Sequence, residues 1–116
     1  MATRAIYTFK DEDTTIHVYK HWDGYPEAAL KFIEKAIAMA WALPRFEADE
    51  FAASFVAANK EQAGDIRLMN CIEVPDMGQE FQYIVTCTNG KIWVSWEGVY
   101  GPLDELIAKY CKEEVA

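Results

Sequence analysis

The stretch HWDGYP, which begins at His21, gathers side chains that could do chemistry into six consecutive positions. An imidazole can exchange a proton near neutral pH, and the indole and phenol rings can stack on a planar ligand. Pro26 is a common first residue of a helix, and a helix N-terminus presents free N–H groups to an anionic or nucleotide-like ligand. The sequence therefore predicts a candidate ligand site that consists of His21, Trp22, Asp23 and Tyr25.

The same six residues also fit a structural corner between a strand and a helix. Asp23 and Gly24 form a typical turn pair, and a residue before proline, such as Tyr25, favours the extended conformation of a helix cap. Trp22 and Tyr25 can pack over this junction without any ligand. Asp23 would also repel an anion at the helix end, unless it bound a ribose hydroxyl or the edge of a base. Both interpretations stay open.

No other pattern predicts a metal centre, a cofactor or catalytic residues. His17 and His21 are four apart in a predicted strand, so about 13 Å separates them and they cannot share one metal ion. Ser54 and Ser95 lack a G-x-S-x-G context, and no phosphate-binding glycine loop is present. The 19 acidic residues offer carboxylate pairs without a specific spacing. The sequence favours a non-enzymatic protein, with an enzyme built from scattered acids and His21 as an alternative.

Length and composition predict one globular domain that spans residues 1–116. The chain is 52% hydrophobic and 26% charged, which is ordinary for a folded domain. No apolar run reaches the roughly 18 residues of a membrane helix, and the first residues do not resemble a signal peptide. Cys71, Cys87 and Cys111 show no C-x-x-C spacing, which favours reduced thiols. We therefore expect a cytoplasmic protein.

The net charge is −8, and small acidic clusters lie at residues 11–13, 47–50 and 113–114. Direct binding of nucleic acid needs a basic surface, so this charge disfavours it. An acidic surface can instead steer a basic protein partner, although it can also serve solubility alone.

The first half of the chain predicts two strands followed by two helices. Residues 3–9 and 14–20 are rich in β-branched and aromatic side chains and indicate a hairpin. A long amphipathic helix begins at Pro26 and ends before Pro44. A second helix spans residues 48–60, with Gly64 as the expected stop.

The second half predicts three strands and a last helix. Residues 65–74 alternate, and residues 81–88 and 91–97 flank Asn89-Gly90, which is typical of a type I′ hairpin. The last helix begins at Gly101-Pro102. The expected fold is α+β, with an antiparallel sheet of about five strands, three helices packed on one face, and the element order β-β-α-α-β-β-β-α.

The second face of this sheet is the predicted interface. If Ile92, Val94 and Trp96 point at the helices, then Trp93 points away from them, together with neighbours on other strands. Exposed aromatic residues mark binding surfaces, and a homodimer formed sheet to sheet is their simplest use. The loop over residues 74–79 could instead cover some of these rings. The predicted interface residues are His17, Tyr19, Ile84 and Trp93.

Three segments, TRAIYTF, VYKHWDGYPEAA and WALPRFEADEFAASFVAANK, resemble a family of small uncharacterised proteins of bacteria, phages and prophages. The resemblance covers residues 3–70 and is most specific in HWDGYP. It implies an interaction protein that binds and blocks a host macromolecule, here through acidic and aromatic surfaces. The alternative is a protein that binds or sequesters a small, nucleotide-like ligand at the HWDGYP turn.

Overall fold

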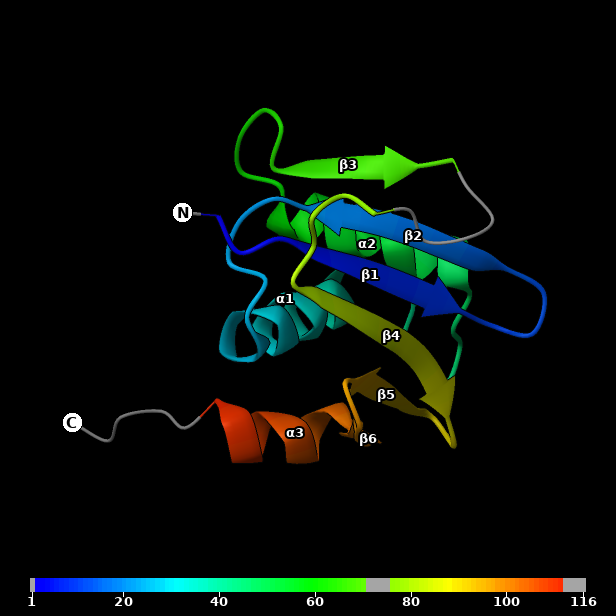
Figure 1. The fold of residues 1–116 in the computed structure, drawn as a ribbon. Helices are drawn as coiled ribbons and strands as arrows, with labels where there is room; N and C mark the ends of the chain where they lie inside the picture. The colour runs from blue at the N-terminus through cyan, green and yellow to red at the C-terminus, as the bar shows by residue number, and fades with distance from the viewer. Residues whose placement is uncertain (1, 71–75, 112–116) are drawn as a thin grey trace.

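The structure, a computed structural model, describes residues 2–70 and 76–111. Figure 1 shows one sheet whose strands run from β3 at the top to β6 at the bottom, with α2 behind β1 and β2 and α3 beside β6. Along the chain the elements are β1 (Ala5–Lys10), β2 (Thr15–Lys20), α1 (Pro26–Met39), α2 (Ala48–Asn59), β3 (Ile66–Met69), β4 (Phe81–Thr88), β5 (Lys91–Trp96), β6 (Val99–Pro102) and α3 (Leu103–Tyr110).

The sheet has six strands in the order β3-β2-β1-β4-β5-β6, and it is mixed rather than antiparallel. The predicted hairpin of β1 and β2 is confirmed, with Ala5 opposite Lys20. However, β1 pairs with β4 in parallel, with Ala5 opposite Phe81. The prediction of an antiparallel sheet was therefore wrong at its centre, because alternation of side chains gives the two faces of a strand but not its direction.

Alternating residues of the central strands form the core, as predicted for Ile92, Val94 and Trp96 of β5. The residues that point into it include Tyr7 and Phe9 of β1, Tyr83 and Val85 of β4, and Ile92, Val94 and Trp96 of β5. The period of two places their neighbours on the opposite face of the sheet.

All three helices cover this one face, which confirms the predicted layering. In α1 the buried stripe is Ala29, Leu30, Ile33 and Ala36. Phe55 of α2 packs on Tyr7, with ring centroids 4.5 Å apart. Tyr110 of α3 packs on Trp96 at 5.3 Å, and Trp96 contacts Tyr83 at 5.4 Å.

A sixth strand, β6, is absent from the predicted order. It forms a second tight hairpin with β5, in which Trp96 faces Val99 across Glu97-Gly98. The φ angles of Glu97 and Gly98 are +39° and +82°, close to those of Asn89 and Gly90 at +52° and +74°. Positive φ at both positions is typical of a type I′ turn, but glutamate rarely adopts it, so Glu97-Gly98 was not predicted to be a turn.

Two boundaries also differ from the prediction. Helix α1 ends at Met39, before the expected stop at Pro44. The described part of the third strand is short, Ile66–Met69, and residues 71–75 of the predicted strand lie outside the described residues.

Candidate functional site

The backbone of the HWDGYP corner is fixed by bonds to three other segments. The His21 N–H donates to the Asp65 carbonyl at 2.7 Å, and the Gly24 N–H donates to the Thr3 carbonyl at 2.8 Å. The Tyr83 hydroxyl donates to the Gly24 carbonyl at 2.6 Å. A Cβ at Gly24 would lie 2.7 Å from the Ala5 Cβ, so only glycine allows the corner to approach β1 this closely.

A buried ion pair anchors the same corner. Lys20 Nζ lies 2.9 Å from Asp65 Oδ1, and both side chains are 4% exposed. The same ammonium donates to the Trp22 carbonyl at 3.1 Å and lies 4.4 Å from the centroid of the Phe32 ring. Two hydrogen bonds and an aromatic face therefore offset the cost of burying this charge.

The four predicted ligand residues do not converge on one point. The Tyr19 hydroxyl and His21 Nδ1 are hydrogen-bonded at 2.8 Å, and the Trp22 ring lies edge-on to His21, with ring centroids 4.7 Å apart. Tyr25 caps α1 with its backbone, while its ring is 42% exposed. Asp23 is exposed and adopts φ +59°, so the positive φ of the turn falls on Asp23 rather than on Gly24.

Two of the four predicted interface residues are buried. His17 is 5% exposed and its Nδ1 is hydrogen-bonded to the Thr8 hydroxyl at 2.8 Å. Tyr19 is 3% exposed, and the Arg67 guanidinium lies 5.5 Å from its ring centroid. Of the two alternatives for these residues, exposed or covered, the structure shows both side chains covered.

The other two predicted residues, Ile84 and Trp93, are half-buried, and Trp93 packs against an aromatic residue that the sequence analysis missed. Tyr100 of β6 is 65% exposed and its ring centroid lies 4.9 Å from that of Trp93. Tyr100 faces Ser95 in the β5–β6 ladder, so it lies on the helix-free face. Recognising the Glu97-Gly98 turn would have revealed Tyr100.

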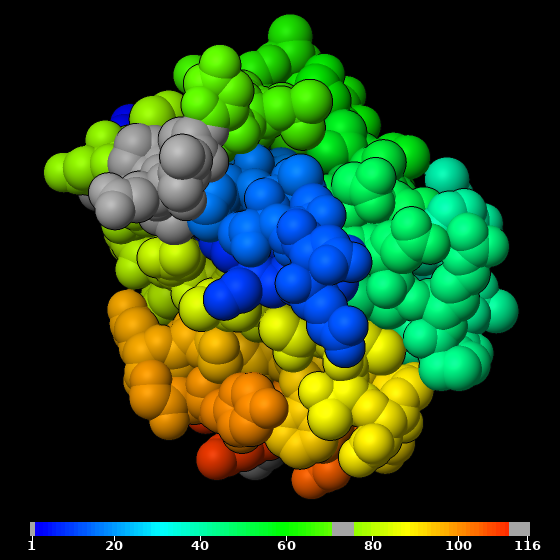
Figure 2. Space-filling view, turned by 90° about the vertical axis from the view of Figure 1, so that its right-hand side faces the viewer, coloured from blue at the N-terminus to red at the C-terminus, as the bar shows by residue number. Residues whose placement is uncertain are grey.

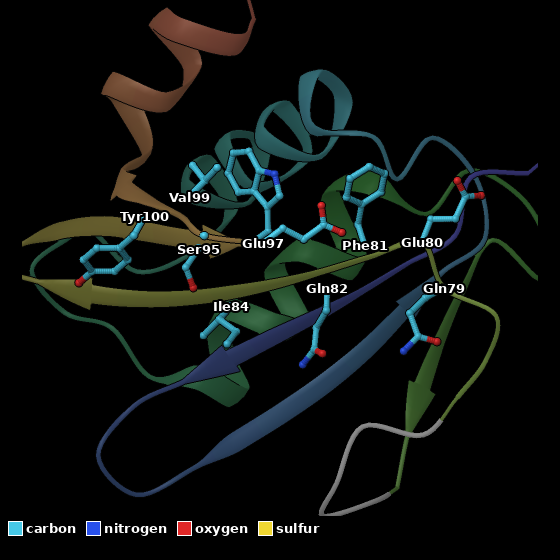
Figure 3. Close-up of a pocket in the computed structure, with 11 residues that line it drawn as sticks. Gln79, Glu80, Phe81, Gln82, Ile84, Ser95, Glu97, Val99 and Tyr100 are labelled. Atoms are coloured by element: carbon cyan, nitrogen blue, oxygen red, sulfur yellow. The ribbon is translucent and has the colours of Figure 1, made fainter.

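A hollow of about 670 Å³ opens beside Tyr100 (Figure 3). Both carboxylates that line it, Glu80 and Glu97, are exposed, and neither forms an ion pair within the described residues. Figure 3 shows the Glu97 carboxylate extended towards Phe81. Ile84, Gln82 and Ser95 also line the hollow.

The hollow exists because β5 turns away from β4 early. The β4–β5 ladder begins at Ile84, which faces Ser95, and two residues later the chain turns at Glu97 into β6. The first residues of β4 therefore pair only with β1. Burial, with the charges of Glu97 and Glu27, raises the pKa of Tyr83 behind this opening.

A second hollow, of about 450 Å³, brings together two acidic clusters that are far apart in the sequence. Figure 2 shows the β1–β2 turn, in blue, next to the segment before α2, in blue-green. Glu12, Asp13, Glu47 and Asp49 line the hollow between these segments. Asp11 has a structural task there, since its Oδ2 accepts the Ala48 N–H of α2 at 2.7 Å. This bond, with those from Asp13 and Thr14, lowers the pKa of Asp11.

Within residues 2–70 and 76–111, no three His, Cys, Asp or Glu side chains are placed to hold a metal ion. In the same part of the chain, no helix is long and apolar enough to cross a membrane. Cys87 and Cys111 are free thiols whose pKa is raised by burial, which disfavours the nucleophilic thiolate. Cys71 lies outside the described residues.

Comparison of the sequence with models of known protein families, with curated proteins and with solved structures found no match.

Proposed function

We propose that this protein binds a basic segment of another protein through one surface, the aromatic–acidic surface, formed by Ile84, Trp93, Tyr100, Glu80 and Glu97. The observation that carries the proposal is the exposed Tyr100 ring, packed at a tilt of 34° against Trp93, beside a hollow with two unpaired carboxylates. Aromatic rings provide contact area at a low cost in side-chain entropy, which is typical of binding surfaces.

The charge distribution supports a basic partner. The whole chain carries −8, so its long-range field attracts cations. On the far side of the two rings a hollow of about 700 Å³ is lined by Lys91 and Lys109 as well as Glu105. The Glu80 side of Tyr100 is therefore the more acidic side, and we expect the basic part of a partner to lie there.

The wider role that we propose is to bind and block a host macromolecule, as the resemblance to phage and prophage proteins implies. A homodimer formed through the same rings is the competing use of this surface. Light scattering separates the two uses, because a dimer that depends on these rings loses half its molar mass in Trp93→Ala, whereas a monomer that binds a partner keeps its mass.

The direct test compares proteins retained from a bacterial lysate by wild type and by variants. Tyr100→Ala is expected to lose the retained partner, because it removes the exposed ring of the proposed surface. The variant should still fold, since Tyr100 is 65% exposed. Trp41→Ala is the matched control, since Trp41 is another exposed aromatic residue, 40% exposed, in the segment after α1. If Tyr100→Ala retains the same partner as wild type, the proposal is wrong.

The alternative function, binding of a nucleotide-like ligand at the HWDGYP corner, has less support. The backbone groups of His21 and Gly24 and the ammonium of Lys20 already have partners within the chain. Native mass spectrometry tests it directly. A small molecule that co-purifies, leaves on denaturation and is lost in Tyr25→Ala would favour this alternative over the aromatic–acidic surface.

A further inference from the structure

The hollow beside Tyr100 exposes the backbone of one strand residue, Gln82, on the edge that faces β5. The Phe81 N–H donates to the Arg4 carbonyl at 3.4 Å, which directs Phe81 towards β1. Successive residues of a strand direct their N–H and C=O groups to opposite edges, so those of Gln82 point towards β5. The β4–β5 ladder starts only at Ile84, and the described residues supply no backbone partner for Gln82 there.

This opening is a notch, because it is closed at one end. From Ile84 onwards β5 itself occupies this edge of β4, and the Glu97-Gly98 turn at its end leads away into β6. A chain that passes straight through is blocked at this point. Only a chain terminus can lie in the line of β5 and pair with Gln82.

The charges at the closed end decide which terminus fits. Glu97 lies at the turn and Glu80 lies two residues before Gln82, and neither has an ion pair within residues 2–70 and 76–111. A terminal carboxylate would be repelled there, whereas a terminal ammonium is attracted. An amino terminus also fits the strand direction. A chain that begins at the turn and runs away from it is antiparallel to β4, as β5 is.

We propose that the notch binds the free amino terminus of a partner protein as an added strand, with its first residue paired to the backbone of Gln82. This inference rests on the proposed function, since it names the part of the partner that the aromatic–acidic surface takes. Recognition by strand addition combines backbone hydrogen bonds for affinity with side-chain contacts for specificity.

The register gives the chemistry of the first three residues. If the first residue faces Gln82, the second faces Phe81, the first residue of β4, and the third lies past the end of the strand, near Glu80. The Glu80 N–H also donates to the Arg4 carbonyl, at 2.9 Å, so Glu80 lies outside the regular strand. A basic third side chain would lie past the end of this ladder, where the exposed Glu80 carboxylate attracts it. We therefore expect Lys or Arg at the third position and a free ammonium near Glu97. Three extended residues span about 10 Å.

The experiment uses a library of peptides with three randomised residues at a free amino terminus, followed by a constant Ser-Gly linker. An otherwise identical library is acetylated at its amino terminus. Peptides retained by the full-length protein are quantified by mass spectrometry, and dissociation constants are then measured for the enriched sequences. We expect enrichment of Lys or Arg at the third position and an affinity at least tenfold lower after acetylation.

Single variants assign the two contacts. Glu97→Gln should remove the preference for a free amine, and Glu80→Gln should remove the preference for Lys or Arg at position three only. Glu61→Gln, an exposed glutamate in the loop before β3, is the matched control and should change neither preference.

Two results would overturn the inference. Equal retention of both libraries would show that no terminus is recognised. Retention of neither library would show that the notch takes no extended chain. In both cases the proposed function is judged separately, by whether Tyr100→Ala loses its partner from the lysate.

Discussion

At the scale of single residues, two tyrosines in the core differ in one respect that mutation can isolate. Tyr7 and Tyr83 are both fully buried, and their rings stack with centroids 5.2 Å apart. The Tyr83 hydroxyl donates to the Gly24 carbonyl, whereas the Tyr7 hydroxyl has no hydrogen-bond partner among the described residues.

We expect Tyr83→Phe to lower the free energy of unfolding by about 1 kcal/mol, since it leaves the Gly24 carbonyl without its donor. Tyr7→Phe should leave stability unchanged or raise it by up to about 1 kcal/mol, because it removes a desolvated hydroxyl that gains no bond. Urea denaturation measures both, with the m value as a check that the denatured states match. Equal losses in the two variants would contradict this assignment.

The Asp11 carboxylate gives a pH-dependent prediction. Hydrogen bonds from the Ala48, Asp13 and Thr14 N–H groups hold the pKa of Asp11 below its usual 3.8 in the folded protein. Its contribution to stability is therefore present above the unfolded pKa and is lost as the pH falls through the folded pKa. We expect Asp11→Asn to lower the Tm at pH 7, with a difference that shrinks below about pH 4.

Thermal unfolding followed by circular dichroism between pH 2 and 8 measures this difference. Glu12→Gln changes the neighbouring exposed carboxylate, whose side chain caps no helix, and serves as the control. A Tm difference that stays constant at all pH values would mean that the Asp11 charge contributes nothing.

At the scale of secondary structure elements, the Lys20–Asp65 pair connects β2 with the segment that enters β3 and with the HWDGYP corner. Asp65→Leu leaves a buried ammonium with one hydrogen-bond acceptor, the Trp22 carbonyl, and no counter-charge, so we expect the free energy of unfolding to fall by about 3 kcal/mol or more. The double variant Lys20→Met, Asp65→Leu should be more stable than Asp65→Leu. A double variant that loses the sum of both single effects would show that the two side chains act independently.

The edge strand β3 exposes a large apolar side chain, Leu68, which is 76% exposed beside Val56 and Ala53 of α2. An unpaired strand edge with an apolar side chain favours association with other chains, and lysine is a common protection there. We expect Leu68→Lys to reduce light scattering on heating and to change the free energy of unfolding by less than about 0.5 kcal/mol. More scattering in the variant would contradict this role for the edge.

The sequence predicted those elements whose local chemistry is distinctive. Asn89-Gly90 marks its hairpin because both residues tolerate positive φ, and Pro26 marks the start of α1. Glu97 adopts a similar conformation without such a signal, so β6 and Tyr100 were missed. The burial of His17 and Tyr19 could not be predicted, because the pattern of a strand does not tell whether the second face of the sheet is covered.

At the scale of the whole molecule, the net charge of −8 gives a kinetic prediction. If the partner is basic, the association rate should fall as salt is added, because ions screen the field that steers the encounter. Stopped-flow measurements with an enriched basic peptide, between 20 and 500 mM NaCl, measure this slope. A rate that is independent of salt would contradict electrostatic steering.

The parallel pairing of β1 with β4 determines how the molecule is assembled on the ribosome. Residues 5–9 pair with residues 81–85, so the central ladder closes only after most of the chain has been made. Until then the edge of β1 that faces β4 has no backbone partner. The core side chains of β1, Tyr7 and Phe9, also lack their neighbours from β4. Non-local pairing of this kind slows folding, because a long loop must close first. The central ladder of the nascent chain therefore closes only once β4 has left the ribosome.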